Sequence, residues 1–132
     1  MSGMKPSLVE YFDREADRRD EWRKKNWYYP AEVLRLFRFF IPPQSSVIEL
    51  GCGTGDLLAG LEPERGVGLD ISPRMIETAS GKYPRLRWLV GDLENLELPE
   101  KFDYVVISDL TGYLNDIEKA FRHAWEIGLP TF

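Results

Sequence analysis

The chain has 132 residues, of which 43% are hydrophobic and 13% aromatic, a composition typical of one globular domain. Its 17 basic and 22 acidic side chains give a net charge of −5, and this balance disfavours binding to nucleic acid through phosphate contacts. The single cysteine excludes a disulfide framework and a CxxC metal site. Because no apolar run is long enough to span a membrane, we expect a cytoplasmic protein without a metal or a membrane partner.

Two helices are predicted before any strand. Residues 7–26 carry many charges of both signs, with several apolar side chains on one side, which predicts a weakly amphipathic helix. The segment NWYYP at 26–30 interrupts this pattern. Apolar residues at helical spacing then predict a second helix over 31–41, which the prolines at 42–43 end.

Apolar strands alternate with helical segments in the rest of the chain. Strands are predicted over 47–50, 66–70, 86–92 and 102–108, and helices over 56–61, 73–80 and 115–127. Ser72 is expected to cap the helix that begins at Pro73. The alternation predicts an α/β fold in which helices cover both faces of a parallel sheet.

The segment VIELGCGTGDL at 47–57 places an acidic residue and three glycines where the first strand gives way to a helix. Gly51, Gly53 and Gly55 allow the backbone to turn tightly and to approach a ligand without an intervening Cβ. In an open parallel sheet, the region beyond the carboxyl end of a strand is the usual ligand crevice. A purely structural turn needs one glycine, so the alternating spacing predicts a ligand-binding loop.

Carboxylates occur at the ends of four successive predicted strands, namely Glu49, Asp70, Asp92 and Asp109. Asp70 is suited to accept hydrogen bonds from two ribose hydroxyls, which fits NAD as well as other nucleosides. However, the spacing GxGxG differs from the dinucleotide pattern GxGxxG, and Glu49 is a poor neighbour for a pyrophosphate. The acidic rim favours a ligand with a ribose, an amine and a positive charge, and S-adenosylmethionine has all three.

Four segments, in this order, resemble the motifs of the class I S-adenosylmethionine-dependent methyltransferases. They are ELGCGTG at 49–55, GLDIS at 68–72, VGD at 90–92 and YVVISD at 104–109. The resemblance implies a Rossmann-like open parallel sheet of strand order 3-2-1-4 that follows N-terminal helices. It also implies that S-adenosyl-L-methionine is the cofactor and S-adenosyl-L-homocysteine the product.

The same resemblance implies that the chain is divided into two parts. Residues 1–43 would form a helical segment that acts as a lid, and residues 44–132 a methyltransferase domain that stops before strands five to seven of the family.

The resemblance further implies a role for each matching residue. Glu49 and the glycine loop would hold the methionine part of the cofactor, and Asp70 would hold the ribose. Residues 71 and 75 would flank the adenine, residues 92 and 93 would receive its edge, and residue 108 would lie beneath the methyl group. The implied cofactor-binding set is Glu49, Gly51, Cys52, Gly53, Gly55, Asp70, Ile71, Met75, Asp92, Leu93 and Ser108.

Methyl transfer is an in-line displacement that requires alignment, exclusion of water and, for a hydroxyl acceptor, removal of a proton. Asp109 and Tyr113 follow the fourth predicted strand and are the candidates for orienting the acceptor or acting as a base. Their alternative roles are a turn cap and a core residue. The segment ISDLTGYL at 107–114 contains neither Asn-Pro-Pro-Tyr nor Pro-Cys, which favours a small-molecule acceptor over a nucleobase or a glutamine side chain.

Three functions remain open at this point: methyl transfer to a small molecule, cofactor binding by a truncated module without catalysis, and half of an NAD-dependent oxidoreductase. Glycine spacing and Glu49 disfavour the third. Without a fifth strand, the apolar fourth strand would form a sheet edge, and the helix over 115–127 has a broad apolar stripe. We therefore expect a homodimer through strand four and the last helix.

Overall fold

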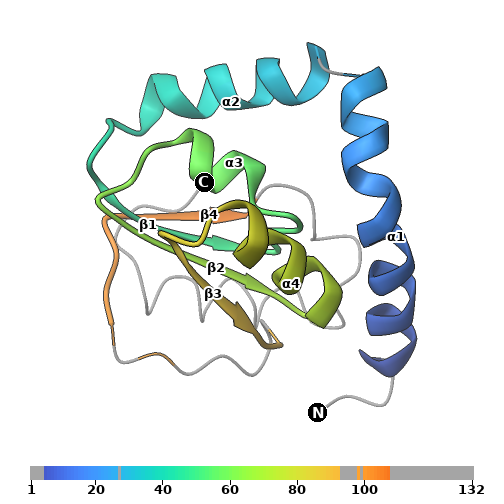
Figure 1. Ribbon diagram of the computed structural model, residues 1–132. Helices are drawn as coiled ribbons and strands as arrows, with labels where there is room; N and C mark the ends of the chain where they lie inside the picture. Colours follow the sequence, from blue (N-terminus) through green and yellow to red (C-terminus); the bar gives the residue numbers. More distant parts are fainter. Residues whose placement is uncertain (1–4, 27, 93–97, 99, 108–132) are drawn as a thin grey trace.

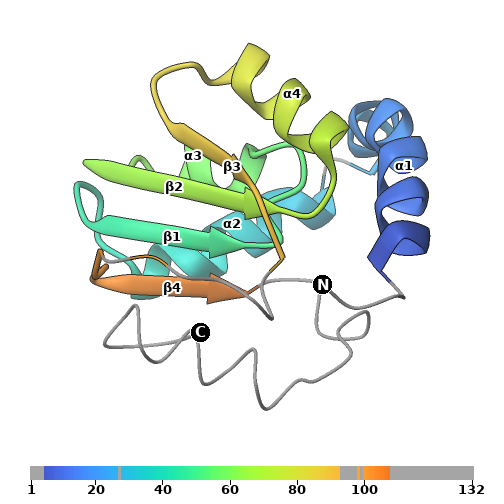
Figure 2. The same ribbon diagram turned by 90° about the horizontal axis from the view of Figure 1, so that it is seen from below.

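The computed structural model of the chain describes residues 5–26, 28–92, 98 and 100–107, and four strands in these ranges form one parallel sheet. The spatial order is β3-β2-β1-β4, which confirms the predicted open sheet and its strand order (Figure 2). The strands are β1 (Ser46–Leu50), β2 (Arg65–Asp70), β3 (Arg87–Val90) and β4 (Tyr104–Ile107).

The central position of β1 follows from its pairing with both neighbours. Glu49 lies opposite Gly68 of β2 on one side and Val106 of β4 on the other. Since all three pairings in the sheet are parallel, the carboxyl ends of the four strands lie at the same edge. The loop that follows β1 therefore lies in the middle of that edge.

Four helices are described, and for three of them both ends lie close to the predicted residues. They are α1 (Lys5–Lys25), α2 (Tyr28–Phe40), α3 (Asp56–Gly60) and α4 (Pro73–Lys82). The predicted start of the second helix at residue 31 was wrong, because Pro30 was read as part of a break. Proline is tolerated in the first turn of a helix, where its missing N–H has no partner to lose, so α2 begins at Tyr28. The helix predicted over 115–127 lies outside the described residues.

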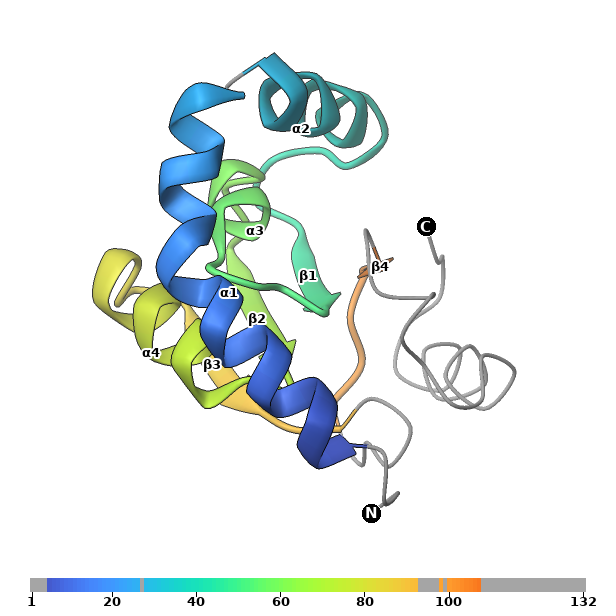
Figure 3. The same ribbon diagram turned by 90° about the vertical axis from the view of Figure 1, so that its right-hand side faces the viewer.

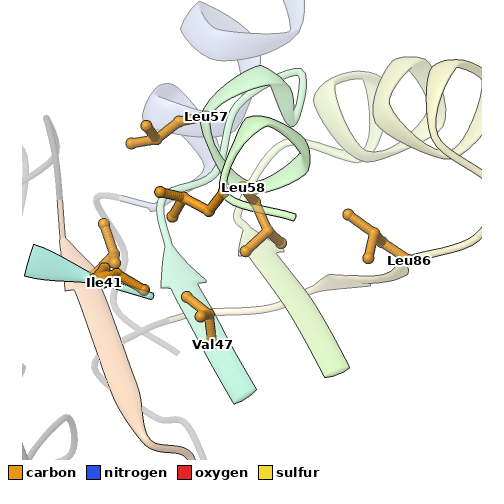
Figure 4. Packing of buried hydrophobic residues seen from close by; sticks show 7 residues of the cluster. Ile41, Val47, Leu57, Leu58 and Leu86 are labelled. Atoms are coloured by element: carbon orange, nitrogen blue, oxygen red, sulfur yellow. The ribbon is translucent and has the colours of Figure 1, made fainter. Parts of the chain in front are cut away.

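One face of the sheet is packed against α2 and α3. Side chains alternate along a strand, so Val47 of β1 and Val106 of β4 point to this face, where Leu57 and Leu58 of α3 cover them. Figure 4 shows the side chains of this cluster, some of them labelled, beside α3 and the strands. The buried members are Ile41, Val47, Leu57, Leu58, Leu61, Leu86 and Val106.

The opposite face of the sheet carries a second apolar cluster. Strand residues whose side chains point away from the first face form this second cluster, together with Phe102, which precedes β4. Its buried members are Ile48, Leu50, Val67, Leu69, Phe102 and Val105. A sheet with apolar residues on both faces agrees with the predicted α/β class.

The amino end of the sheet is held by polar contacts between strands. Glu100 accepts hydrogen bonds from Arg65 at 2.9 Å and from Arg87 at 2.7 Å, so one carboxylate joins the first residues of β2 and β3. Ser46 donates its backbone N–H to Asp103 Oδ2 at 3.1 Å, and the Asp103 N–H donates to Ser46 Oγ at 2.8 Å. These bonds fix the start of β1 against the start of β4.

Helix α1 lies across the other end of the sheet. Figure 1 shows it beside the tips of β1 and β2, and Figure 3, viewed from that side, shows it crossing in front of them. It packs against α4, which follows β2. Within the described ranges, neither α1 nor any other helix is long and apolar enough to cross a membrane.

Candidate functional site

The loop that follows β1 turns through three residues with positive φ. Gly51, Gly53 and Gly55 have φ angles of 80°, 57° and 89°, values that residues with a side chain adopt only at a cost. The N–H groups of Gly51 and Cys52 donate to the Leu69 carbonyl at 2.8 and 3.0 Å. The glycines therefore allow the loop to fold back onto the end of β2.

Asp70, the last residue of β2, joins this loop to the start of α4. Its Oδ2 accepts the Gly53 N–H at 2.8 Å, and its Oδ1 accepts the Ser72 N–H at 3.0 Å. The residue is only 5% exposed. A carboxylate oxygen can accept more than one hydrogen bond, so this residue type is suited to receive the hydroxyl donors of a ligand.

The backbone of the loop is poorly suited to bind an anion. Among its five N–H groups, those of residues 51, 52, 53 and 55 donate to acceptors within the protein. A phosphate-binding loop offers its N–H groups to the ligand instead. The loop geometry therefore agrees with the prediction that a pyrophosphate does not bind here.

Acidic side chains lie on both sides of the loop, and the one that precedes it is buried. Glu49, next to the last residue of β1, is 2% exposed, and Asp56 begins α3 directly after the loop. Asp56 is held by the Tyr83 hydroxyl and by Lys82, whose Nζ lies 2.7 Å from its Oδ1. In its ionised form, the Glu49 side chain repels an anion and attracts a cation.

Gly55 has a second reason to lack a side chain. A Cβ at this position would lie 2.5 Å from the Trp88 ring of β3, and a Cβ at Gly68 would meet the same ring. The indole N–H of Trp88 donates to the Tyr83 carbonyl at 2.8 Å, which fixes the ring against α4. Trp88 thus supports the glycine loop from within the fold, a role that the sequence alone did not suggest.

The two residues expected to flank an adenine lie under α1. Met75 in the first turn of α4 is 0% exposed and packs with Phe12 and Ala16 of α1. Ile71, just after β2, is half-buried against the same cluster. The structure therefore brings α1 to the segment that the family resemblance assigns to the adenine.

Asp92 is half-buried two residues after β3, and the neighbouring Gly91 donates its N–H to the Asp70 carbonyl at 2.9 Å. This bond places the end of β3 next to the end of β2. The remaining predicted site residues, Leu93, Ser108, Asp109 and Tyr113, lie outside the described residues. Their predicted roles stay predictions.

Ser72 caps α4 as predicted, since its Oγ accepts the Met75 N–H at 3.1 Å. The same hydroxyl donates to Asp13 of α1, and the Arg74 N–H donates to Asp13 at 3.2 Å. Sequence reasoning missed Asp13, because a contact between residues 13 and 72 leaves no local pattern. No group of three His, Cys, Asp or Glu side chains within the described ranges is arranged to hold a metal ion.

The described edge can hold a nucleoside with a positive charge nearby. Asp70 is oriented by two backbone donors, Glu49 supplies a buried carboxyl group, and the loop between them has no bulky side chain at residues 51, 53 and 55. These features fit S-adenosylmethionine better than NAD, because they combine a hydroxyl acceptor with an environment that disfavours a pyrophosphate.

Comparison with known proteins agrees with this assignment. The family model described as "Methyltransferase domain" matches residues 47–130. A malonyl-[acyl-carrier protein] O-methyltransferase of Ilyobacter polytropus is 31% identical over 74% of this chain and 39% of its own. A dTDP-4-amino-2,3,4,6-tetradeoxy-D-glucose N,N-dimethyltransferase of Saccharopolyspora spinosa is 33% identical over 76% of this chain and 42% of its own.

The fold is also similar to solved structures. An S-adenosylmethionine-dependent methyltransferase from Thermotoga maritima superposes with a TM-score of 0.78 at 25% identity, covering 91% of this chain and 56% of the other. The chain spans about half the length of the curated relatives it matches, between 39% and 54% for the first four.

Proposed function

Since the chain belongs to the S-adenosylmethionine-dependent methyltransferase family, we propose that it binds S-adenosylmethionine at the carboxyl edge of the sheet and transfers the methyl group to a small molecule. The observation that carries this proposal is the arrangement of Asp70 and the glycine loop beside the buried Glu49. It offers a hydroxyl acceptor and negative charge where a dinucleotide would require free N–H donors.

Each described residue of the edge has a proposed task in holding the cofactor. Asp70 accepts the ribose hydroxyls, while the Gly53 and Ser72 N–H groups keep its carboxylate in place. Glu49 faces the positively charged end, and Ile71 contacts the adenine. The bound cofactor supplies a methyl group that is already activated by its sulfonium, so the protein contributes alignment and exclusion of water.

The acceptor side of the site is proposed from the sequence. Asp109 and Tyr113 follow β4 in the chain and are our candidates for orienting the acceptor or removing its proton. The curated relatives named above methylate an oxygen in one case and an amino group in the other. These two relatives support an acceptor that presents an oxygen or an amino group.

Calorimetric titration tests the proposal first at the level of binding. We expect S-adenosylhomocysteine to bind with 1:1 stoichiometry and NAD to bind more weakly or not at all. Tighter binding of NAD would contradict the cofactor assignment. Incubation with S-adenosylmethionine and candidate hydroxyl or amine acceptors then distinguishes a methyltransferase from the alternative, a module that binds the cofactor without catalysis.

We also propose that the protein forms a homodimer through β4 and the segment over 115–127. In the described part of the sheet, β4 pairs with β1 and is the last strand in the order. An apolar strand at a sheet edge favours association with another chain. Sedimentation equilibrium at micromolar concentration should give twice the monomer mass of 15.3 kDa, and a monomer would contradict the proposal.

A further inference from the structure

The carboxylate of Asp13 completes the first turn of α4 from a distant part of the chain. Its Oδ1 accepts the Ser72 hydroxyl and the Arg74 N–H, the latter at 3.2 Å. Ser72 Oγ in turn accepts the Met75 N–H at 3.1 Å. A hydroxyl can donate one hydrogen bond and accept others, so Ser72 connects α1 with α4 without losing its capping bond.

Ser72 also contacts Asp70, the residue that we assign to the ribose. The Ser72 N–H donates to Asp70 Oδ1 at 3.0 Å, and Asp70 Oδ2 receives the Gly53 N–H at 2.8 Å. A continuous series of hydrogen bonds therefore runs from Asp13 through Ser72 and Asp70 to the glycine loop. Ser72 is 0% exposed and packed on all sides, so it has little room to move independently of its neighbours. A shift of Ser72 therefore also moves the Asp70 carboxylate to which its N–H donates.

An apolar contact accompanies this series. Phe12, adjacent to Asp13, and Ala16 pack on Met75, and Ile71 completes the cluster. The polar and the apolar contacts of α1 both fall on residues 71–75, between the end of β2 and the first turn of α4. This is the segment expected beside the ribose and the adenine.

We propose that Asp13 is a positioning residue for the cofactor, which latches α1 onto α4 and holds Asp70, through Ser72, in the direction that receives the ribose. This inference rests on the proposed function. It assigns α1 a role in binding the nucleoside half of the cofactor, in addition to packing against the domain. Because coupling between two events is reciprocal, bound cofactor must also stabilise the docked position of α1.

Three variants test the latch. Asp13→Ala removes the acceptor, Asp13→Asn keeps an acceptor oxygen of similar reach, and Glu10→Gln changes an exposed acidic residue one turn earlier in α1 as a control. Calorimetry should show that Asp13→Ala lowers the affinity for S-adenosylhomocysteine by about 5- to 20-fold, mainly the effect of the lost, partly buried hydrogen bond to Ser72. Asp13→Asn should restore most of the affinity, and Glu10→Gln should match the wild type.

Adenosine provides a second probe of the same variants. If the latch acts on the ribose and adenine, Asp13→Ala must lower the affinity for adenosine by the same factor as that for S-adenosylhomocysteine. Unchanged affinity for adenosine, or an Asp13→Ala variant that binds S-adenosylhomocysteine as tightly as the wild type, would overturn the latch. Circular dichroism verifies that the variants are folded.

Hydrogen exchange on the wild type keeps the inference testable if Asp13→Ala does not fold. S-adenosylhomocysteine should slow the exchange of backbone amides in α1, and exchange in α1 that does not respond to saturating ligand would refute the coupling. A wild type that binds no S-adenosylhomocysteine would remove the proposed function and the latch together. Binding by the wild type with unaffected variants would remove the latch alone.

Discussion

The two ends of the parallel sheet use acidic side chains in different ways. At the amino end, Glu100 is neutralised by Arg65 and Arg87 in exposed ion pairs that join two strands. At the carboxyl end, Asp70 is almost fully buried and receives backbone N–H groups of the following segments. The first arrangement holds strands together, whereas the second prepares a charged group for a ligand.

The difference has an energetic basis. Exposed ion pairs contribute about 0–1 kcal/mol each and cost little desolvation, so they are suited to surface contacts between strands. Burial of a carboxylate is unfavourable unless its oxygens receive hydrogen bonds. Asp70 receives two from backbone N–H groups, and Glu49 is buried at the same edge of the sheet. Such a concentration of buried acidic groups is expected where function, rather than stability, selects the residue.

The largest expected effect comes from a side chain in the loop at the carboxyl end. Gly53→Val should abolish measurable binding of S-adenosylhomocysteine, because a β-branched residue is strongly disfavoured at a φ of 57° and its side chain would displace the bond to Asp70. Calorimetry measures the loss, and circular dichroism should retain most of the helical signal. Gly81→Val is the matched control, since a Cβ at Gly81 meets no atom within 4 Å. Unchanged affinity in folded Gly53→Val would show that this loop does not serve the cofactor.

A smaller effect separates the two ends directly. Asp70→Ala should weaken the binding of S-adenosylhomocysteine by about 1–3 kcal/mol, because two backbone donors and the ribose lose their acceptor. Glu100→Gln should leave this affinity unchanged and lower the free energy of unfolding by no more than about 2 kcal/mol, because both of its ion pairs are at the surface. If Glu100→Gln reduced the affinity for S-adenosylhomocysteine as much as Asp70→Ala, the proposed difference between the two ends of the sheet would be wrong.

The smallest effect is a pH dependence at the amino end. Hydrogen bonds from the backbone and side chain of Ser46 lower the pKa of Asp103 from its ordinary value of 3.8. A folded pKa below the unfolded one means that Asp103 stabilises the fold above pH 3.8 and that this contribution is lost as pH falls through the lowered value. Urea unfolding should therefore show Asp103→Asn to be less stable than the wild type at neutral pH, with the difference shrinking as the pH falls below 3.8. A difference independent of pH would exclude this linkage.

The sequence predicted the strands and the position of the glycine loop because both depend on local patterns, whereas the strand order was implied by the family resemblance. Apolar runs that alternate with helical segments identify β1 to β4, and three glycines after Leu50 identify the turn at the edge. The start of α2 was missed because Pro30 has the same local signature in a break and in a first helical turn.

The missed parts of the site depend on contacts between distant segments. Asp13 meets Ser72 across 59 positions, and Trp88 fills the space that Gly55 and Gly68 leave on two other elements. No spacing rule connects such residues, so only the folded chain reveals them. Asp109 and Tyr113 were assigned from their place after a strand, and mutation with an acceptor assay is needed to test them.

Mapping of the bound ligand by amide chemical shifts tests most directly whether the carboxyl end is the cofactor site. Addition of S-adenosylhomocysteine to ¹⁵N-labelled protein should shift the amide signals of residues 51–55 and 70–75, including Gly53 and Ser72, whose N–H groups contact Asp70. Signals of Ser46, Arg65 and Arg87 at the amino end should remain in place. Shifts confined to the amino end, or none under saturating ligand, would contradict the assignment of the two ends.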